Sequence, residues 1–425
     1  MQYKLQYGKK EISFSLDSKH PCKVVLPKEA TFTLTGGAEV VRALNNPIRS
    51  KKIGAIVRPG EKTVIVTSDI SRPLPSQIIL PPLLAQLHNA AGIRHEDITI
   101  VLALGIHRGH TPDEYRFLLG DEIYNRYRCI DSNVSKCLRL GVCKNGTPVD
   151  VFSEVVKADR RICLGNTEYH YFAGYSGGMK AIMPGVSSKE AIQANHRLMV
   201  HPNAAIGRLE ANPVREDIDE VADFLPVDFI VNVVLDEKKE IIHASAGHYF
   251  AAHRESCRFL DSLNKIEIPE QADVVIASPG GYPKDINLYQ AQKALANAQT
   301  VVKEGGVIIL AAACSEGYGE ETFERWINMY TTPEQRLQEI QRHFELGGHK
   351  AAAIAIAQQK ASIFLVSDLD DDLVKKINMY PFRCLQAAVD QALSGRLSNA
   401  SLVIMPQAGS VLPVLTENRC TKGTG

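Results

Sequence analysis

The stretch Ile98–Thr111 reads I-T-I-V-L-A-L-G-I-H-R-G-H-T and joins a short apolar run to a turn rich in glycine and histidine. A short run of Val, Ile and Leu that ends in turn residues is typical of a buried parallel strand. The same arrangement recurs in other parts of the chain, where the apolar runs are Val64–Thr67, Ile162–Leu164, Val274–Ala277, Val307–Ala313 and Ile363–Val366. The sequence therefore predicts a series of parallel strands, each followed by a polar motif at its carboxyl end.

Amphipathic stretches between these runs predict helices, namely Gln77–Ala91, Leu288–Glu304 and Pro333–Leu346, the last closed by Gly347-Gly348. Alternating strands and helices imply right-handed crossovers and an open doubly wound sheet. Ligands bind such sheets beyond the carboxyl ends of the strands. We therefore expect an α/β protein whose polar motifs converge on one cleft.

The length of the chain indicates two lobes, since 425 residues exceed the roughly 100–200 that are usual for one domain. A second strand–helix series begins after the charged, proline-containing stretch Asn264–Gln271. We predict an N-terminal domain over residues 1–266 and a C-terminal domain over residues 267–425, each built on a mostly parallel sheet flanked by helices. The active site is expected in the cleft between the lobes, and the last residues are expected to be able to pack back on the N-terminal domain.

The amino-terminal segment, about 45 residues long, has a different pattern. Tyr3–Leu16 and Cys22–Leu26 alternate polar and apolar residues around Gly8-Lys9-Lys10. This pattern predicts an antiparallel hairpin, which we expect to be attached to the first sheet.

The overall composition is that of a globular protein with a small partner. Lys+Arg and Asp+Glu number 48 each, so no net charge favours nucleic acid or an anionic membrane. The longest apolar run, near Val307–Cys314, is far shorter than the ~20 residues that cross a bilayer, and Met1–Leu16 does not resemble an export signal. Nine cysteines without a C-x-x-C pair fit reduced thiols in the cytoplasm, and we expect Cys163 and Cys314 to be buried and inert.

Residues able to carry chemistry are densest in Gly165–His201, which holds five glycines, three histidines and two lysines. Its glycines allow tight turns whose N–H groups could cradle a phosphate. The stretch matches neither G-x-G-x-x-G nor G-x-x-x-x-G-K-[ST], so no dinucleotide or P-loop site is indicated. His196 and His201 are five residues apart, which disfavours a zinc site of the H-E-x-x-H type. Lys180 is open to interpretation as a phosphate contact, a covalent anchor or a solvated charge.

Two motifs at predicted strand ends each allow a functional and a structural interpretation. His107 and His110 flank Gly109, where an imidazole could exchange protons at neutral pH or serve the fold. Asp69 and Arg72 belong to S-D-I-S-R-P, where Arg72 could grip a carboxylate or Asp69 could simply cap a helix.

A third motif opens the predicted helix that follows Pro279-Gly280-Gly281. Gln290 and Lys293 are three apart and share a face near its amino end, where the helix dipole favours an anion. A solvated polar face is the structural alternative.

Taken in order, the motifs S-D-I-S-R-P, G-I-H-R, H-Y-F-A-G-Y-S-G-G-M-K-A-I-M-P-G-V, N-H and Y-Q-A-Q-K resemble those of the nickel-dependent lactate racemase family. The resemblance covers most of the chain, and H-Y-F-A-G-x-S-G-G-x-K is its most specific segment. It implies a racemase or 2-epimerase of a 2-hydroxy acid. It also implies a nickel pincer nucleotide, which is a pyridinium-3-thioamide-5-thiocarboxylic acid mononucleotide that holds nickel and is supplied by cofactor-maturation enzymes.

The resemblance assigns a role to individual residues of this chain. Lys180 would carry the cofactor through a thioamide, His196 would ligate nickel, and His107 and His170 would be the acid/base pair. Further cofactor contacts are implied at Asp69, Phe172, Ser176, Gly177 and Gly178. Substrate contacts are implied at Arg72, Tyr289, Gln290 and Lys293.

One departure from the family pattern leaves the substrate open. Lactate racemases place a tryptophan in the C-terminal lobe, where this sequence reads His349-Lys-Ala-Ala-Ala-Ile-Ala, and the single tryptophan, Trp326, is expected in a helix core. Lactate, malate, a longer aliphatic acid and an aldonic acid all remain candidates. Two other functions are also considered, an NAD-dependent 2-hydroxy acid dehydrogenase, which lacks fingerprint support, and a non-catalytic carrier of the nickel nucleotide.

Overall fold

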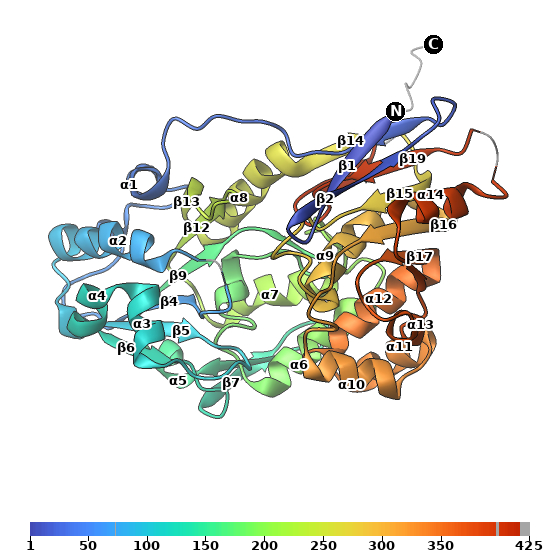
Figure 1. Ribbon diagram of the computed structural model, residues 1–425. Helices are drawn as coiled ribbons and strands as arrows, with labels where there is room; N and C mark the ends of the chain where they lie inside the picture. Colours follow the sequence, from blue (N-terminus) through green and yellow to red (C-terminus); the bar gives the residue numbers. More distant parts are fainter. Residues whose placement is uncertain (73, 397–398, 417–425) are drawn as a thin grey trace, which may run out of the picture. The chain divides into compact units, whose positions relative to one another are not determined.

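The computed structural model describes residues 1–72, 74–396 and 399–416, and the chain divides into two compact units (Figure 1). Unit 1 consists of Met1–Glu29 and Leu263–Gly425, and unit 2 of Ala30–Ser262. Both units are α/β, as the strand–helix alternation predicts.

Unit 2 is built on a six-stranded sheet of order β13-β12-β9-β4-β5-β6. Its strands are β4 (Thr63–Ser68), β5 (Ile98–Ala103), β6 (Arg128–Asp131), β9 (Arg160–Asn166), β12 (Phe229–Leu235) and β13 (Ile241–Gly247). Only β13 runs antiparallel to its neighbour. The strand order reverses at β4, which lies between β5 and β9, and ligands of open α/β sheets bind at the carboxyl ends of strands beside such a reversal.

Alternate residues of these strands face a core formed with the first two helices, because side chains of a strand point to opposite faces in turn. Ile65, Ile100 and Ile162 share this core with Leu44 and Leu83.

The helices of unit 2 are α1 (Gly36–Asn45), α2 (Ser76–Ala91), α3 (Pro112–Leu119), α4 (Asp121–Arg126), α5 (Ser153–Lys157), α6 (Lys189–Arg197), α7 (Pro213–Phe224) and α8 (Tyr249–Asn264, ending in unit 1). Four 3-10 turns accompany them, η1 (Ile53–Ala55), η2 (His95–Asp97), η3 (Gly178–Ala181) and η4 (Leu198–Val200). Two short antiparallel pairs are β7 (Cys137–Val142) with β8 (Pro148–Phe152), and β10 (Tyr169–His170) with β11 (Gly174–Tyr175).

Unit 1 contains a second six-stranded sheet of order β18-β17-β16-β15-β19-β3, with every pair parallel. Its strands are β3 (Cys22–Val24), β15 (Ala272–Ala277), β16 (Val302–Ala311), β17 (Ala361–Val366), β18 (Tyr380–Phe382) and β19 (Leu402–Met405). Smaller pairs are β1 (Gln2–Tyr7) with β2 (Lys10–Ser15), and β14 (Lys265–Ile268) with β20 (Leu412–Leu415). The helices are α9 (Leu288–Ala298), α10 (Glu321–Met329), α11 (Pro333–Arg342), α12 (Gly348–Lys360), α13 (Asp371–Lys376) and α14 (Leu385–Leu393).

The amino-terminal hairpin is confirmed, but its predicted attachment to the first sheet is wrong. Leu5, Tyr7 and Phe14 are buried in the core of the second sheet, and Figure 1 shows β1 and β2 beside the strands of unit 1. The short β3 adds a parallel strand at the edge of β19. Residues 1–29, which we assigned to the N-terminal domain, thus lie with the C-terminal residues because their apolar face is buried there.

Two further expectations concern the end of one helix and the carboxyl-terminal residues. The helix predicted over Leu288–Glu304 ends at Ala298, and β-branched residues then lead directly into β16. The last described strand, β20, pairs with β14 inside unit 1, and the residues after 416, which belong to the segment expected to be able to pack on the N-terminal domain, lie outside the described residues.

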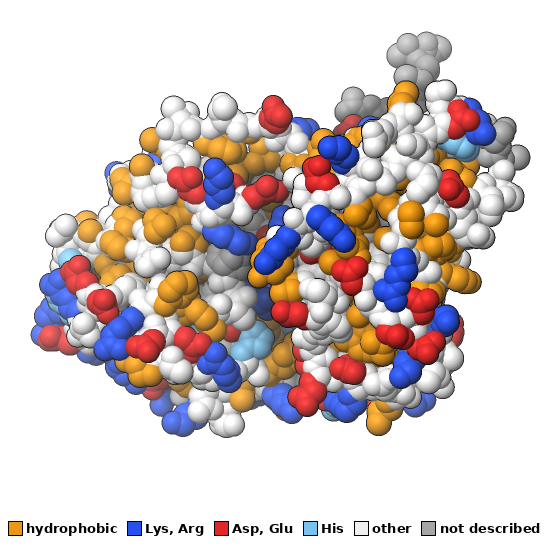
Figure 2. All heavy atoms as spheres, viewed as in Figure 1, with side chains coloured by type: hydrophobic (Ala, Val, Ile, Leu, Met, Phe, Trp, Pro, Cys, Tyr) orange, Lys and Arg blue, Asp and Glu red, His pale blue; other side chains and the backbone are white. Residues whose placement is uncertain are grey.

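Trp326, the charged side chains and two of the cysteines agree with what the sequence predicts. Trp326 is buried in α10, as expected, and its Nε1 donates to Glu345 at 2.6 Å. Figure 2 shows acidic and basic side chains interspersed over the visible face, in keeping with their equal numbers. No helix among the described residues is long and apolar enough to cross a membrane. Burial raises the pKa of the Cys163 thiol to about 12, and Cys314 is also buried, which fits inert thiols.

Candidate active site

The first feature of the site is a carboxylate–imidazole pair at the carboxyl ends of β4 and β5. Asp69 is 2% exposed and its Oδ2 lies 2.5 Å from Nδ1 of His107, whose side chain is 29% exposed. Ser71 Oγ donates to both carboxylate oxygens, at 2.8 and 3.0 Å. Burial raises the pKa of Asp69, but the hydrogen bonds from His107 and Ser71 outweigh it and keep the pKa below its usual value. Because an ionised carboxylate only accepts, Nδ1 of His107 carries hydrogen and Nε2 keeps a lone pair.

The neighbouring His110 has a structural role. Its Nδ1 lies 2.6 Å from Asp131 Oδ1, and its Nε2 accepts from the backbone N–H of Ile70 at 3.0 Å. The side chain is fully buried, and both ring nitrogens are engaged. The structure thus separates two histidines between which the sequence could not choose, leaving His107 as the candidate base.

His170 follows β9, the neighbour of β4 on its other side. Its Nδ1 accepts from the backbone N–H of Ala173 at 3.3 Å, so a neutral ring carries its hydrogen on Nε2. Phe172 contacts the ring edge-on, with centroids 4.5 Å apart. Burial lowers the pKa of His170 well below its usual value, and nearby positive charges, Lys180 and Arg72 first among them, add to the effect.

Lys180 lies in η3 and is half-buried. Its ammonium makes no hydrogen bond or ion pair with any residue in the described part of the chain. Burial lowers the pKa of Lys180 well below its usual value, and the charges of Arg215 and Arg72 contribute. A lowered pKa increases the share of the neutral amine at a given pH, and the neutral amine is the nucleophilic form of a lysine.

His196 lies in the last turn of α6 and packs edge-on against Phe172, with centroids 5.0 Å apart. Burial lowers its pKa to about 3, and the charges of Lys180 and Arg72 add to this effect. The ring is therefore neutral at physiological pH, which is the form that binds a metal ion. Among the described residues, His196 belongs to no group of three side chains placed to share a metal ion.

The loop between His170 and Lys180 is held by residues that the sequence did not single out. Asn212 Nδ2 donates to the carbonyl of Phe172 at 2.8 Å, and Arg215, fully buried, donates to the carbonyls of Ala173 and Tyr175. Both residues belong to the amino-terminal end of α7, with Asn212 as its cap. Nothing local in the sequence reveals these contacts, since they join side chains to remote carbonyl groups.

Ser176 and the glycines beside it also serve this loop. Ser176 Oγ donates to the carbonyl of Asn166 at 2.6 Å and so closes the turn. Gly177 and Gly178 have positive φ, and a Cβ on Gly178 would lie 2.8 Å from the ring of His253. The glycine pair is therefore required by backbone conformation and close packing, whatever else its N–H groups bind.

The remaining predicted residues are exposed, except for Tyr289. Arg72 follows β4, and its guanidinium makes no hydrogen bond within the described residues; Pro73, which ends its motif, lies outside them. In unit 1, Tyr289, Gln290 and Lys293 lie on the first turns of α9. Gln290 and Lys293 are exposed and Tyr289 is half-buried.

Family comparison identifies the chain. The Lactate racemase N-terminal domain family matches residues 7–207, and the Lactate racemase C-terminal domain family matches residues 268–413. The chain belongs to the lactate racemase family. Lactate racemases from Thermoanaerobacterium thermosaccharolyticum and Lactiplantibacillus plantarum are 33% and 32% identical over 420 residues, covering 96% of this chain and 98% of each relative.

One solved structure agrees with membership of the lactate racemase family, and a second shares the fold. The lactate racemase apoprotein from T. thermosaccharolyticum matches with a TM-score of 0.88 and 31% identity, covering 97% of this chain and 100% of that one. A Thermotoga maritima protein, at 18% identity, shares the fold with a TM-score of 0.62 over 89% of this chain and 97% of its own.

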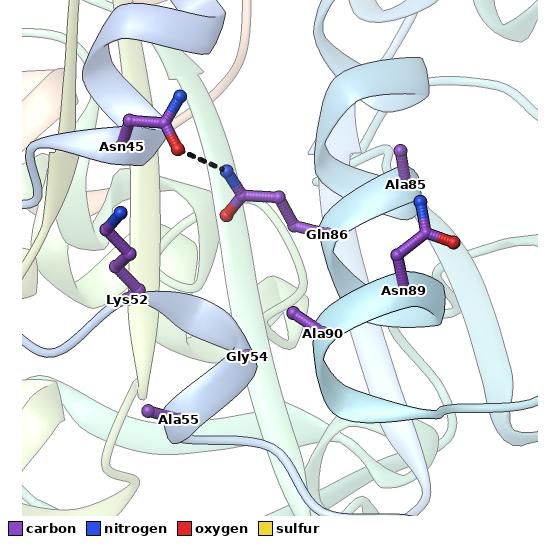
Figure 3. A pocket seen from close by; sticks show the side chains of 8 residues that line it. All are labelled: Asn45, Lys52, Gly54, Ala55, Ala85, Gln86, Asn89 and Ala90. Carbon is purple, nitrogen blue, oxygen red and sulfur yellow. Dashed lines mark hydrogen bonds between the residues drawn. The ribbon is translucent and has the colours of Figure 1, made fainter.

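A surface pocket in unit 2 is separate from these residues. It lies between α1, η1 and α2, and Figure 3 shows the side chains that line it, which are Asn45, Lys52, Ala55, Ala85, Gln86, Asn89 and Ala90, with the backbone of Gly54. Gln86 donates to Asn45 across it at 3.3 Å. It contains no acid, base or nucleophile besides one lysine, so we assign it no part in the reaction.

Proposed function

We propose that this member of the lactate racemase family inverts the C2 centre of a 2-hydroxy acid, with lactate, the substrate named for its relatives, as the reference substrate. The observation that carries the proposal is the 2.5 Å contact between Asp69 and His107, because it orients an imidazole as a base at the carboxyl ends of the strands. The family membership supports an isomerase.

We further propose that the protein holds a nickel pincer nucleotide. The residues present fit this group, since Lys180 offers an amine without a partner among the described residues and His196 offers a neutral imidazole. Lys180 would be the covalent attachment point and His196 the protein ligand of nickel, with further contacts from Asp69, Phe172, Ser176, Gly177 and Gly178. When bound, the cofactor supplies an acceptor for the α-hydrogen as hydride, which the chain itself lacks.

His107 acts on the hydroxyl group of the substrate in this proposal. Its Nε2 lone pair takes the hydroxyl proton, and the ring becomes an imidazolium that the Asp69 carboxylate stabilises. An imidazole is too weak a base to remove the α-hydrogen as a proton, so its task is limited to the oxygen.

His170 complements this base. Its hydrogen lies on Nε2, where His107 has a lone pair, so the two rings offer a donor and an acceptor. Inversion passes through a planar 2-keto acid whose oxygen must be protonated again after the other face has been attacked. One imidazole that can accept the hydroxyl proton, His107, and one that can donate a proton to the keto oxygen, His170, suit this reaction.

The remaining assignments complete the proposal. Arg72 would bind the substrate carboxylate, and Tyr289, Gln290 and Lys293 would contact the substrate from α9. Cofactor-maturation enzymes would supply the nickel nucleotide, and a cytoplasmic location stays a prediction.

The test is intact mass and nickel analysis of protein produced with and without the maturation enzymes. The wild type should gain the adduct mass and nickel only with those enzymes, and the Lys180→Arg variant should gain no covalent mass. Lys189→Arg, an exposed lysine on α6, is the matched control and should behave as wild type. An adduct on Lys180→Arg, or none on the wild type, would remove the proposed tether.

Two alternative functions are separated by assays on the loaded protein. Conversion of one pure enantiomer to the racemic mixture without NADH formation supports a racemase, and stoichiometric NADH formation supports a dehydrogenase. A carrier would show neither reaction. The Asp69–His107 pair favours an enzyme over a carrier, because carrying a cofactor needs no oriented base.

A further inference from the structure

The hairpin that carries His170 is too short to hold its own shape. It consists of β10 and β11, which have two residues each and pair Tyr169 with Tyr175 and His170 with Gly174. An isolated antiparallel pair of strands is at best marginally stable in water, even at ordinary strand length. The position of His170 therefore depends on contacts from outside the hairpin.

Asp261 of α8 supplies such a contact to both strands. Tyr169 Oη donates to Oδ1 of Asp261 at 3.0 Å, and Tyr175 Oη donates to the same oxygen at 2.7 Å. The centroids of the two rings lie 5.4 Å apart. Because Tyr169 and Tyr175 are partners across the strand pair, one carboxylate oxygen fixes both strands to the same helix. All three residues belong to unit 2.

The two phenols are permanent donors in this contact. Burial raises the pKa of Tyr169 and of Tyr175 far above the usual value, and the charge of Asp261 adds to the effect. Both hydroxyls therefore keep their hydrogen at physiological pH. A hydrogen bond from a hydroxyl to a carboxylate is among the stronger kinds in proteins, and water competes little for Tyr175, which is 2% exposed.

The bonds to Asp261 also determine which way His170 points. Successive side chains of a strand point to opposite faces, so a Tyr169 side chain directed at α8 turns the next side chain, His170, away from that helix. The Nδ1 of His170 then accepts from the backbone N–H of Ala173, in the turn between the two strands, at 3.3 Å. The direction of Nε2–H thus depends on both strands, because the turn requires that they stay paired.

We propose that Asp261 is a positioning residue, which acts through Tyr169 and Tyr175 to hold the Nε2–H of His170 toward the substrate oxygen. The inference rests on the proposed function, because it takes His170 as a group that transfers a proton. Asp261 itself touches no reacting atom in this assignment. Its loss should therefore disturb the transfer of the proton and leave substrate binding largely unchanged.

The first test removes only the two hydroxyl donors. Tyr169→Phe/Tyr175→Phe keeps both rings and the Asp261 carboxylate. In cofactor-free wild type labelled with ¹⁵N-histidine, His170 should appear as one tautomer with hydrogen on Nε2, its signal being identified by its loss in His170→Gln. The double variant should show both tautomers, and the amide hydrogen of Ala173 should exchange about 10-fold faster, because the hairpin opens more often.

The rate of the cofactor-loaded protein is the second readout. A misplaced acid–base group slows the chemical step more than binding, so kcat for lactate should fall by about 10- to 100-fold in the double variant with little change in KM. Asp261→Leu, which removes the acceptor and keeps both tyrosines, should lower kcat at least as much. Tyr249→Phe is the control, since Tyr249 is half-buried at the start of α8 and its hydroxyl makes no hydrogen bond with any described residue.

The outcomes distinguish this role from a general effect on stability and from the proposed function. The proposal is overturned if the His170 tautomer and Ala173 exchange match wild type in either variant, or if exchange quickens equally in β4 and β5. A rise in KM without a fall in kcat also overturns it. If the loaded wild type inverts no 2-hydroxy acid, the proposed function fails, and the spectra of the cofactor-free protein still decide whether Asp261 orients His170.

Discussion

At the scale of single residues, His107 and His110 show what a local sequence can and cannot predict. The pattern of a strand followed by G-I-H-R-G-H-T placed both histidines at a strand end, and that placement is confirmed. Their different roles depend on Asp69 and Asp131, which come from other strands, and on burial. Only the spatial arrangement leaves Nε2 of His107 without a hydrogen bond among the described residues and engages both nitrogens of His110.

Replacing Asp69 by asparagine tests the orientation of His107. The amide can donate to Nδ1 and so favour the tautomer with hydrogen on Nε2, which cannot accept the hydroxyl proton. We expect kcat of the loaded enzyme to fall by about 10²- to 10⁴-fold, measured as the rate of inversion of one enantiomer.

Asp97→Asn is the matched control for this variant. Asp97 is equally buried and is paired with Lys62 and Arg94 through its own carboxylate, so its replacement should affect stability and not kcat. If Asp69→Asn inverts substrate as fast as the wild type, the pair has no part in the reaction.

At the scale of elements, the loop that carries Phe172 and the glycine pair is set by the two helices behind it. The strand positions could be predicted from the apolar runs, because a strand that is buried on both faces of a sheet consists mainly of apolar residues. The residues that support the loop could not be predicted in this way, since Asn212, Arg215 and His253 act through side-chain hydrogen bonds to backbone carbonyls that are remote in sequence. Helix ends were also missed where a β-branched segment continued an apolar pattern, as after Ala298.

His253 should make the stability of this loop depend on pH. Its Nε2 lies 2.9 Å from the carbonyl of Ser176 and its Nδ1 lies 2.6 Å from Arg254, so the neutral ring satisfies both partners. Burial lowers the pKa of His253 well below its usual value, and the charges of Arg215 and Arg254 contribute. The unfolded chain therefore binds a proton first as pH falls below about 6.5, and the folded state loses stability on acidification.

The measurement is the free energy of unfolding of the cofactor-free protein between pH 8 and pH 5. His253→Gln retains an amide donor for Ser176 but does not titrate, so its stability should fall less steeply below about pH 6.5 than that of the wild type. His248→Gln, an exposed position before α8, is the control and should keep the wild-type slope. If the free energy of unfolding falls equally steeply with pH in all three proteins, His253 does not contribute to the loss of stability in acid.

At the scale of the whole molecule, the chain builds unit 1 from both of its ends. The sequence predicted two α/β lobes and a junction close to the observed one at Ser262, because the strand–helix series restarts there. It could not assign residues 1–29, since alternating residues define a strand but not the sheet that it joins. The assignment depends on which core the apolar face of the hairpin fills.

Phe14→Ala tests this assignment. The ring is buried against the core of the second sheet, so its loss should lower the free energy of unfolding of unit 1 by about 3–5 kcal/mol. Hydrogen exchange should quicken in β15 and β16 and stay unchanged in β4, β5 and β9. Lys4→Ala, exposed on the same hairpin, should have no such effect. Faster exchange confined to β4, β5 and β9 would instead place the hairpin on the first sheet.

The pairing of β3 with β19 also determines when unit 1 can be completed during synthesis. Unit 2 is continuous in sequence, so all of its strands have been made before the ribosome reaches β15. β3, in contrast, must wait for Leu402–Met405 to emerge, which at roughly 5–20 residues per second takes about 20 to 80 s. Throughout that time β3 lacks its native neighbour, and this interval is when a chaperone would have most to protect.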